Sequence, residues 1–234
     1  MRRALAALAL LPAPVLAQAH QCSLPDRIRP LEAPRPDGPA RRLPIAGYTL
    51  AVTWSPEFCR TGRDPQGMQC SLRSGHFGFV LHGLWPEARR GYPQWCSLTP
   101  RPSPALLRQH LCMTPSARLL EHEWAKHGSC MVRTPQAYFR AAAALWRSIA
   151  WPDADRLSRR PDLTVGDLRR EFVLANPDWQ AGQVGIVLSR SGWLQEVRLC
   201  YGRTFMPARC PRNKIGAPDS AALKIWRGLY TKER

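Results

Sequence analysis

A β-strand is first predicted at Tyr48-Thr49-Leu50-Ala51-Val52-Thr53-Trp54, a run dominated by β-branched and aromatic residues. A second apolar strand is expected over residues 77–81, ending at His82. Towards the C-terminus, apolar runs at residues 184–189 and 193–200 flank a Ser-Gly turn, which predicts a hairpin. Strands therefore lie towards both ends of the chain.

Helices are predicted between these strands, because the middle of the chain carries hydroxyl N-caps, a first-turn proline and a glycine stop. They are expected over residues 117–124 with Gly128 as the stop, from Thr134-Pro135 to about Ala150, and from Thr164 with Asp167 to near Asn176-Pro177. This order predicts an α+β fold, a single domain with a mainly antiparallel sheet and helices packed around it.

The N-terminus has the pattern of a secretory signal peptide. A positive Met1-Arg2-Arg3 precedes the apolar run 4–11, which is too short to span a bilayer, and Val15-Leu16-Ala17 fits a small-residue cleavage site. Residues 1–17 are therefore predicted to be removed, although Ala17-Gln18-Ala19 fits the same rule and would place the cleavage after Ala19. We expect a secreted or periplasmic protein with no membrane span.

A proline-rich arm follows the signal peptide. Residues 18–46 have little periodic apolar content and indicate an irregular or extended segment. Residues 47–234 are then expected to form the one catalytic domain, a length that suits a single core. We expect this chain to be a monomer.

Cysteine usage indicates an oxidising compartment. An even number of cysteines in an exported chain suggests up to four disulfides, although sequence alone does not give their connectivity. There is no Cys-x-x-Cys pair, which argues against a zinc ribbon or a thioredoxin-type centre. The eight are Cys22, Cys59, Cys70, Cys96, Cys112, Cys130, Cys200 and Cys210.

The chain is strongly basic, with 34 Lys and Arg against 17 Asp and Glu, a formal net charge of +17. Loss of Arg2 and Arg3 with the signal peptide would lower it to +15. Such a surface attracts polyanions, of which nucleic acid is the first candidate and anionic lipid or lipopolysaccharide the second. GC-rich coding would also produce an arginine-rich chain, so charge alone leaves the partner open.

Two motifs carry the candidate chemistry: Phe79-Val80-Leu81-His82-Gly83-Leu84-Trp85-Pro86 and Glu121-His122-Glu123-Trp124-Ala125-Lys126-His127-Gly128-Ser129-Cys130. On a helix, Glu123 and His127 share one face, and His122 pairs in the same way with Lys126. The two histidines of the second motif are five apart, about 140° around a helix, which does not suit a His-Glu-x-x-His zinc site. We predict no metal and no cofactor.

This residue set suits metal-free cleavage of a phosphodiester. The reaction needs a base for the attacking 2′-hydroxyl and an acid for the departing 5′-oxygen, and histidine can serve as either near neutral pH. Lys126 can supply positive charge where negative charge develops, and Glu123 can orient an imidazole or exchange a proton. Because the nucleophile is the 2′-hydroxyl, RNA is the expected substrate and DNA is not cleaved.

At these residues the chain closely resembles the ribonuclease T2 family. Leu81-His82-Gly83-Leu84-Trp85-Pro86 and His122 to Cys130 match its two signatures in the right order. Trp54-Ser55-Pro56-Glu57-Phe58-Cys59 is similar to a third, with Ser55 as one extra residue, and Glu196 to Cys200 followed by Cys210-Pro211 looks like the late strand and disulfide. The resemblance covers about residues 47–211.

The resemblance implies catalytic roles. His127 would be the general base in transphosphorylation and His82 the general acid, and the two would exchange roles when the cyclic intermediate is hydrolysed. Glu123 and Lys126 would stabilise the transition state, and His122 would hold phosphate.

The resemblance also implies base-binding residues. Trp85 would stack on a base, Glu87 stands where relatives often carry an aspartate that contacts the base, and Tyr92 would be a second ring. A solvated surface position is the alternative for Glu87, and Trp124 is expected in the core. His20, His76 and His110 have no support as site residues.

The disulfides implied by the family are Cys59–Cys70, Cys96–Cys130 and Cys200–Cys210. These leave Cys22 to pair with Cys112, which departs from the commoner family pattern and would pin the arm to the domain.

The implied activity is that of an endoribonuclease that cleaves single-stranded RNA, with low base specificity, to 2′,3′-cyclic phosphate and then 3′-phosphate ends. The alternative is a catalytically weak cationic protein that binds RNA or anionic surfaces on the same scaffold. The sequence does not separate RNA scavenging from toxicity to other cells.

Overall fold

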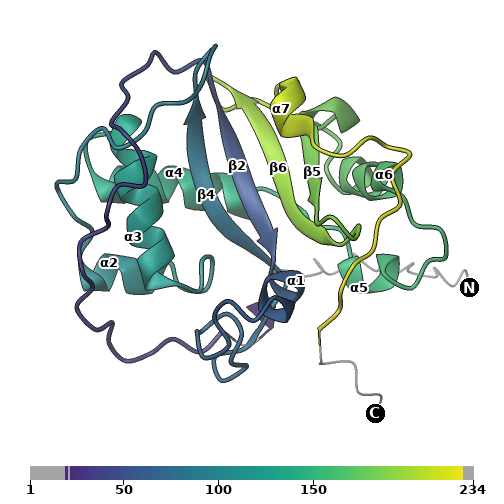
Figure 1. Ribbon diagram of the computed structural model, residues 1–234, viewed down its shortest axis with the longest axis horizontal. Helices are drawn as coiled ribbons and strands as arrows, with labels where there is room; N and C mark the ends of the chain where they lie inside the picture. Colours follow the sequence, from purple (N-terminus) through teal and green to yellow (C-terminus); the bar gives the residue numbers. More distant parts are fainter. Residues whose placement is uncertain (1–18, 21, 229–234) are drawn as a thin grey trace, which may run out of the picture.

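The fold comes from a computed structural model, which describes residues 19–20 and 22–228. A four-stranded antiparallel sheet lies at its centre, in the order β4-β2-β6-β5 (Figure 1). Its strands are β4 (Phe79–Glu87), β2 (Gly47–Trp54), β6 (Leu194–Gly202) and β5 (Val184–Leu188). A separate antiparallel pair joins β1 (Ala19–His20) to β3 (His76–Phe77).

Most of the helices lie in the sequence between β4 and β5, so the predicted α+β class and the predicted hairpin of β5 and β6 are confirmed. The α-helices are α1 (Ser55–Arg60), α2 (Pro104–Gln109), α3 (Ala117–Lys126), α4 (Pro135–Arg147), α5 (Ala154–Leu157), α6 (Val165–Ala175) and α7 (Arg212–Ile215). Two short 3₁₀ segments are η1 (Gly128–Cys130) and η2 (Ala181–Gln183).

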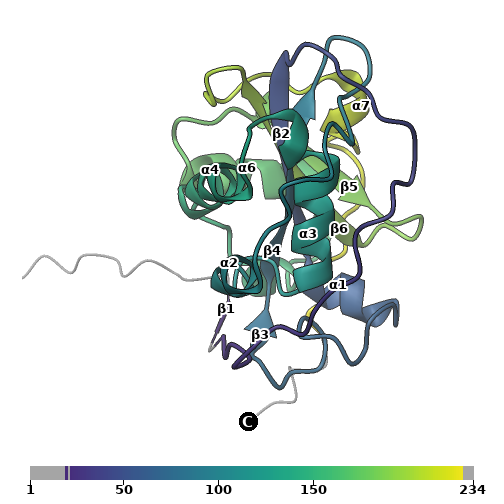
Figure 2. The same ribbon diagram turned by 90° about the vertical axis from the view of Figure 1, so that its left-hand side faces the viewer.

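One face of the sheet forms the core. Leu50, Leu84 and Leu199 lie side by side on β2, β4 and β6, and each is fully buried. Figure 2 shows α4 and α6 packed on this side of the sheet. Full burial of one such side chain contributes about 1.5 to 3 kcal/mol. By alternation along each strand, neighbouring residues such as Trp85 and Arg198 project to the opposite face.

Helix starts follow the predicted capping signals. Thr134 Oγ1 accepts a hydrogen bond from the Ala137 amide, and Thr164 forms a capping box with Asp167. The helix that was expected to reach Ala150 ends earlier, at Arg147. Asn176 bonds both the amide and the carbonyl of Ala150, so the chain has left the helix there.

The end predicted for the strand of the first motif is wrong, whereas the helix of the second motif stops before Gly128, as predicted. The strand expected to end at His82 instead runs to Glu87, and β4 lies at the edge of the sheet, where Pro86 is tolerated. α3 ends at Lys126 with His127 as its C-cap, and Gly128 then begins η1 without adopting a positive φ. Glycine is needed there for space, because a Cβ would lie 2.6 Å from Cγ of Tyr138.

The four disulfides join Cys59 to Cys70, Cys96 to Cys130, Cys200 to Cys210 and Cys22 to Cys112, so every expected pairing is confirmed. The last of these closes a sequence separation of 90 residues. In the chain-entropy account a loop of that size stabilises the fold by about 4 to 5 kcal/mol.

The arm was expected to be irregular over residues 18–46, but β1 lies near its start and pairs with β3. Residues 22–46 carry no helix or strand, as expected, and one isolated bridge joins Arg41 to Gln94. Side chains of the domain hold the arm by its carbonyls: Arg108 bonds Pro25 and Arg101 bonds Leu31. The division at residue 47 stays a prediction, and the predicted signal peptide, residues 1–17, lies outside the described residues. Within the described part, no helix is long and apolar enough to cross a membrane.

Candidate active site

His82 is the extra residue of a β-bulge. Gly83 pairs with Ala51 and Leu81 pairs with Val52, so His82 has no partner on β2. A bulge bends its strand and changes the direction in which a side chain points. The His82 side chain is one-third exposed, whereas its neighbour Leu81 is buried in the core.

Two carboxylates flank the His82 ring. Nδ1 lies 2.9 Å from Oε2 of Glu196 on β6, and Nε2 lies 3.6 Å from Oε1 of Glu123 on α3. Burial alone would lower the pKa of His82, but the bond to Glu196 and the charges of both carboxylates outweigh it and raise the pKa. The arrangement therefore favours the imidazolium form.

Gly83 leaves room for the carboxylate of Glu123. A Cβ on Gly83 would lie 2.0 Å from Oε2 of Glu123 and 2.8 Å from Nε1 of Trp85. Nε1 of Trp85 donates to that same oxygen at 2.7 Å. Burial raises the pKa of Glu123, and the charge of His82 and the indole bond only partly offset it. Gly83 and Trp85 of the first motif therefore form a tight binding site for the Glu123 carboxylate.

His127 follows α3 directly as its C-cap residue, one turn beyond Glu123. Its side chain is buried and its Nδ1 has no hydrogen-bond partner among the described residues. Burial, followed by the charges of Lys126 and His122, lowers the pKa of His127 to about 2. The ring is therefore neutral and able to accept a proton.

The second i, i+4 pair of α3 faces the arm. Nζ of Lys126 lies 2.5 Å from Oδ2 of Asp37, and the ring of His122 stands edge-on to Trp95 with centroids 5.3 Å apart. Burial first, and then the charge of Lys126, lowers the pKa of His122. The two i, i+4 pairs, Glu123 with His127 and His122 with Lys126, thus occupy two adjacent sides of one helix end.

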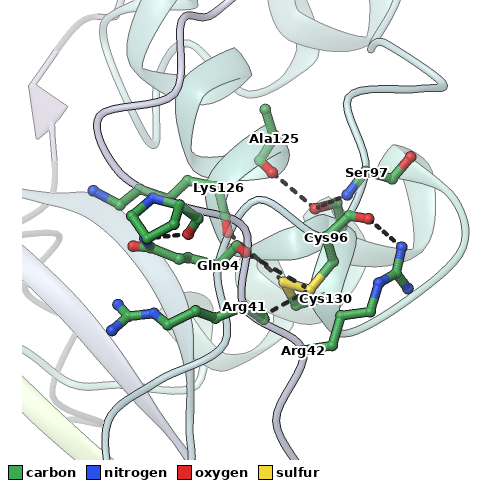
Figure 3. Close-up of a disulfide and its surroundings, with 10 residues drawn as sticks. Arg41, Arg42, Gln94, Cys96, Ser97, Ala125, Lys126 and Cys130 are labelled. Atoms are coloured by element: carbon green, nitrogen blue, oxygen red, sulfur yellow. Dashed lines mark hydrogen bonds between the residues drawn. A yellow bond between two sulfur atoms is a disulfide. The ribbon is translucent and has the colours of Figure 1, made fainter.

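The Cys96–Cys130 disulfide ties this helix end to the segment that follows β4. Figure 3 shows the bridge beside Lys126 and Gln94, with the arm residues Arg41 and Arg42 alongside. The amide of Trp95 donates to the carbonyl of Lys126 at 2.8 Å. The position of Lys126 is therefore set by both covalent and hydrogen-bonded links.

Aromatic rings line the other side of His127. The His127 ring lies 5.6 Å from Trp85 and 6.2 Å from Tyr92, between centroids. The guanidinium of Arg198 lies 5.9 Å from the Trp85 ring, and that of Arg41 lies 4.6 Å from Tyr92. The structure thus brings both sequence-predicted rings to the histidines.

Glu87 lies at the end of β4 and is mostly buried. Its Oε1 accepts a hydrogen bond from the Thr49 hydroxyl at 2.8 Å and lies 2.7 Å from Nζ of Lys214. Lys214 lies 5.6 Å from the Trp85 ring. Glu87 is therefore neither a solvated surface residue nor a free carboxylate, because its nearer oxygen is already shared.

Sequence reasoning missed three groups that the fold brings to the site. Glu196 was recognised only as part of a late strand, Asp37 only as part of an irregular arm, and Lys214 was not singled out. The available signal for Glu196 was an acidic residue within a run that is predicted to be a strand. Asp37 and Lys214 had no local signal, because each is far in sequence from its partner.

The site therefore contains two histidines whose pKa values are shifted in opposite directions, with carboxylates beside one and cations beside the other. A cavity of about 510 Å³ adjoins it, with His82, Glu196 and Arg198 among its lining residues. Across residues 19–20 and 22–228, no group of three or more His, Cys, Asp or Glu side chains is placed to hold a metal ion. The arrangement suits acid and base catalysis on a ligand of negative charge.

Residues 46–154 match the sequence model of the Ribonuclease T2 family. A relative named a probable ribonuclease from Haemophilus influenzae is 36% identical over 186 residues, which cover 74% of this chain and 64% of the relative. A ribonuclease from Aeromonas hydrophila is 40% identical over 98 residues, which cover 42% of this chain and 43% of the relative. The chain thus spans less than two thirds of the length of these two curated relatives.

Solved structures with the same fold include trichomaglin, described as an S-like ribonuclease, with a TM-score of 0.59 and 20% identity over 77% of this chain and 98% of that one. RNase NT, solved with 5′-AMP, gives a TM-score of 0.58 and 21% identity over 78% of this chain and 98% of that one. These likenesses concern the fold. The match of the family's sequence model spans both motifs, in agreement with the resemblance that was stated from the sequence.

Proposed function

We propose that this chain is an endoribonuclease of the ribonuclease T2 type, which cleaves single-stranded RNA by acid and base catalysis without a metal ion; the match of residues 46–154 to that family's sequence model supports the proposal. The observation that carries the proposal is the pair of histidines with opposite pKa shifts, raised at His82 and lowered at His127. Pairs of titratable groups whose environments separate their pKa values are the usual basis for assigning an acid and a base.

In the first step, neutral His127 accepts the proton of the 2′-hydroxyl. The 2′-oxygen bonds to phosphorus, the bond from phosphorus to the 5′-oxygen breaks, and His82 donates a proton to that oxygen. The products are a 2′,3′-cyclic phosphate and a 5′-hydroxyl. An entering phosphate brings negative charge beside His127 and raises its pKa towards the range that a general base needs.

In the second step the two histidines exchange roles. His82, now neutral, takes a proton from water, the hydroxide opens the cyclic phosphate, and His127 returns a proton to the 2′-oxygen. The result is a 3′-phosphate end. Glu196 supports both steps, because its bond to Nδ1 fixes the ring of His82 and leaves Nε2 for proton transfer.

Positive and hydrogen-bonding groups would stabilise the phosphorane. Lys126 supplies the charge, His122 contacts a phosphate oxygen, and Glu123 exchanges a proton with a phosphoryl oxygen, which its raised pKa favours. These roles follow the motif positions, and the convergence of the side chains at the end of α3 supports them.

Base recognition is proposed for Trp85 and Tyr92, whose rings lie near His127. Stacking is tolerant of sequence, which is consistent with low base specificity. Glu87 is proposed to bias the choice of base through the oxygen that Lys214 and Thr49 do not engage.

Export to the cell exterior or periplasm, a monomeric state and an inability to cleave DNA are also part of the proposal. Four disulfides support an oxidising compartment. The alternative, a catalytically weak RNA-binding or anionic-surface-binding protein, is disfavoured by the retention of His82, Glu123, Lys126 and His127 together, which binding alone does not require.

The test is to incubate the mature protein with RNA and with DNA in excess chelator and to identify the product ends. We expect RNA to be cut to cyclic and then 3′-phosphate ends while DNA survives. His82→Ala and His127→Ala should each lower turnover by about 10²-fold to 10⁴-fold and retain RNA binding. Activity that requires added zinc or magnesium would reject the mechanism, and binding without cleavage would favour the alternative.

A further inference from the structure

The proline-rich arm delivers a carboxylate to the lysine of the active site. Nζ of Lys126 lies 2.5 Å from Oδ2 of Asp37, and Nε1 of Trp95 donates to Oδ1 of the same carboxylate at 3.0 Å. The Lys126 side chain is 16% exposed and that of Asp37 is 52% exposed. Both oxygens of Asp37 are thus engaged, yet the group remains open to solvent and to an arriving ligand.

The position of Asp37 is set by the fold. The next residue, Gly38, lies so close to Gln94 that a Cβ would come within 2.9 Å of Nε2. That Nε2 donates to the carbonyl of Pro39 at 2.8 Å, and Arg41 and Gln94 exchange two backbone hydrogen bonds. Figure 3 shows Gln94 and Arg41 next to Lys126 at this junction.

The same segment also contacts the helix end. Trp95 follows Gln94 directly, and its amide donates to the carbonyl of Lys126. The arm, the segment after β4 and the end of α3 therefore meet at one point. Asp37 is held near Lys126 by the fold, because the backbone next to each of the two residues is hydrogen-bonded: the Pro39 carbonyl accepts from Gln94, and the Lys126 carbonyl accepts from the Trp95 amide.

The ionised state of Asp37 follows from this geometry. The bond from Lys126 lowers the pKa of Asp37, burial opposes that effect, and the bond from Trp95 adds to the lowering. A negative charge therefore stays beside Lys126 at and below neutral pH. Any phosphate that approaches Lys126 is attracted by the ammonium and repelled by the carboxylate behind it.

The repulsion depends on the charge of the ligand. A phosphodiester carries one negative charge, whereas a phosphomonoester carries about −1.5 to −2 near pH 7, because its second pKa is near 6. The product of the proposed second step is such a monoester. A fixed carboxylate therefore penalises the product end of the reaction more than the substrate.

We propose that Asp37 is a specificity-determining residue of this site: it positions Lys126 and makes the site favour a monoanionic phosphodiester over a dianionic phosphomonoester. This inference rests on the proposed function, in which Lys126 faces the scissile phosphate. Its consequence is that the 3′-phosphate product binds weakly and leaves, and that free phosphate competes poorly with RNA.

The decisive variant is Asp37→Asn, which keeps the shape and one acceptor but removes the charge. We expect binding to strengthen by roughly threefold to fivefold for each negative charge of the ligand. The dissociation constant of 3′-AMP at pH 7.5 should therefore fall by about tenfold, and the KM of adenylyl-3′,5′-adenosine by about threefold. Calorimetry measures the first quantity without turnover.

Asp26→Asn is the matched control, because it removes the same charge from the same arm. Asp26 is exposed and makes no ion pair within the described part of the chain. It should leave both constants unchanged. At pH 5, where 3′-AMP is largely a monoanion, the effect of Asp37→Asn on 3′-AMP should shrink to that on the dinucleotide.

Equal effects on the two ligands, no effect on either, or weaker binding of both would overturn the proposal. A purely structural role would change the melting temperature without changing the ratio of the two constants. If the wild-type protein binds 3′-AMP but cuts no RNA, the proposed function fails, and the calorimetric comparison still tests Asp37.

Discussion

Glu196→Gln tests whether the partner of His82 sets the pH range of the proposed activity. In the wild type, burial lowers the pKa of His82, but the bond to Glu196 and the charges of Glu123 and Glu196 raise it above the usual value. Glutamine preserves the shape of the side chain and removes one of these charges. The pKa of His82 should therefore fall.

The size of the shift follows from the contact. Nδ1 of His82 lies 2.9 Å from Oε2 of Glu196, and hydrogen bonds to charged groups contribute about 1.5 to 3 kcal/mol. That range corresponds to about 1 to 2 pKa units. Because one-third of the His82 side chain is exposed, solvent screening places the expected value near the lower end, about one unit.

The assay is kcat/KM for a dinucleoside phosphate as a function of pH. His82 must be protonated to act as the acid, so activity falls as pH rises through its pKa. Lowering the pKa of His82 should shift the alkaline limb of the profile to lower pH by about one unit. The control is Glu171→Gln on α6, which removes a carboxylate that pairs with Arg156 of α5. This variant should leave the pH profile unchanged. An unshifted limb in a folded Glu196→Gln protein would refute the assignment of His82 as the acid.

Three further predictions concern the surroundings of the histidines. Gly83→Ala places a Cβ 2.0 Å from Oε2 of Glu123, so the carboxylate must move, and we expect kcat to fall by at least about tenfold while circular dichroism still reports the fold. Reduction should inactivate the enzyme, because loss of a native disulfide costs about 2 to 5 kcal/mol and Cys96–Cys130 ties down the catalytic helix end; thermal unfolding with and without reductant measures the cost. Glu87→Gln should chiefly change the ranking of the sixteen dinucleoside phosphates, measured as relative kcat/KM.

Each of these has a contrary outcome. Unchanged turnover in Gly83→Ala would mean that the carboxylate can shift without loss of its role. Activity that survives full reduction, verified by thiol titration, would separate the disulfide from catalysis. An unaltered dinucleotide ranking would mean that Glu87 only pairs with Lys214 and does not contact the base. Gly182→Ala, whose added Cβ has nothing within 4 Å, is the neutral reference for all three experiments.

Local patterns predicted the elements and the candidate catalytic groups, because the information for both lies within a few residues. The helical spacing placed Glu123 with His127, and His122 with Lys126, on shared faces. The capping signals located the starts of α4 and α6. The even cysteine count predicted disulfides, and the family resemblance supplied the pairing.

Long-range contacts were not visible in the same way. The strand through His82 was predicted to end there, but pairing with β2 extends it to Glu87 and overrides the low strand propensity of Gly83 and Pro86. The bulge depends on a register that two strands decide together. Sequence patterns within β4 alone do not show that His82 will be left without a partner between the pairs Leu81–Val52 and Gly83–Ala51.

Local sequence patterns were enough to predict the candidate acid, base and cation of two motifs, an export signal, paired cysteines and an α+β order of elements. The electrostatics of the site, in contrast, followed only from the three-dimensional fold. It brought Glu196 to His82 and Asp37 to Lys126 across separations of 114 and 89 residues. The physical reason is that a pKa or an ion pair depends on the distance between two groups and on their burial. Both quantities are set only once the strands have paired and the arm is bound to the domain.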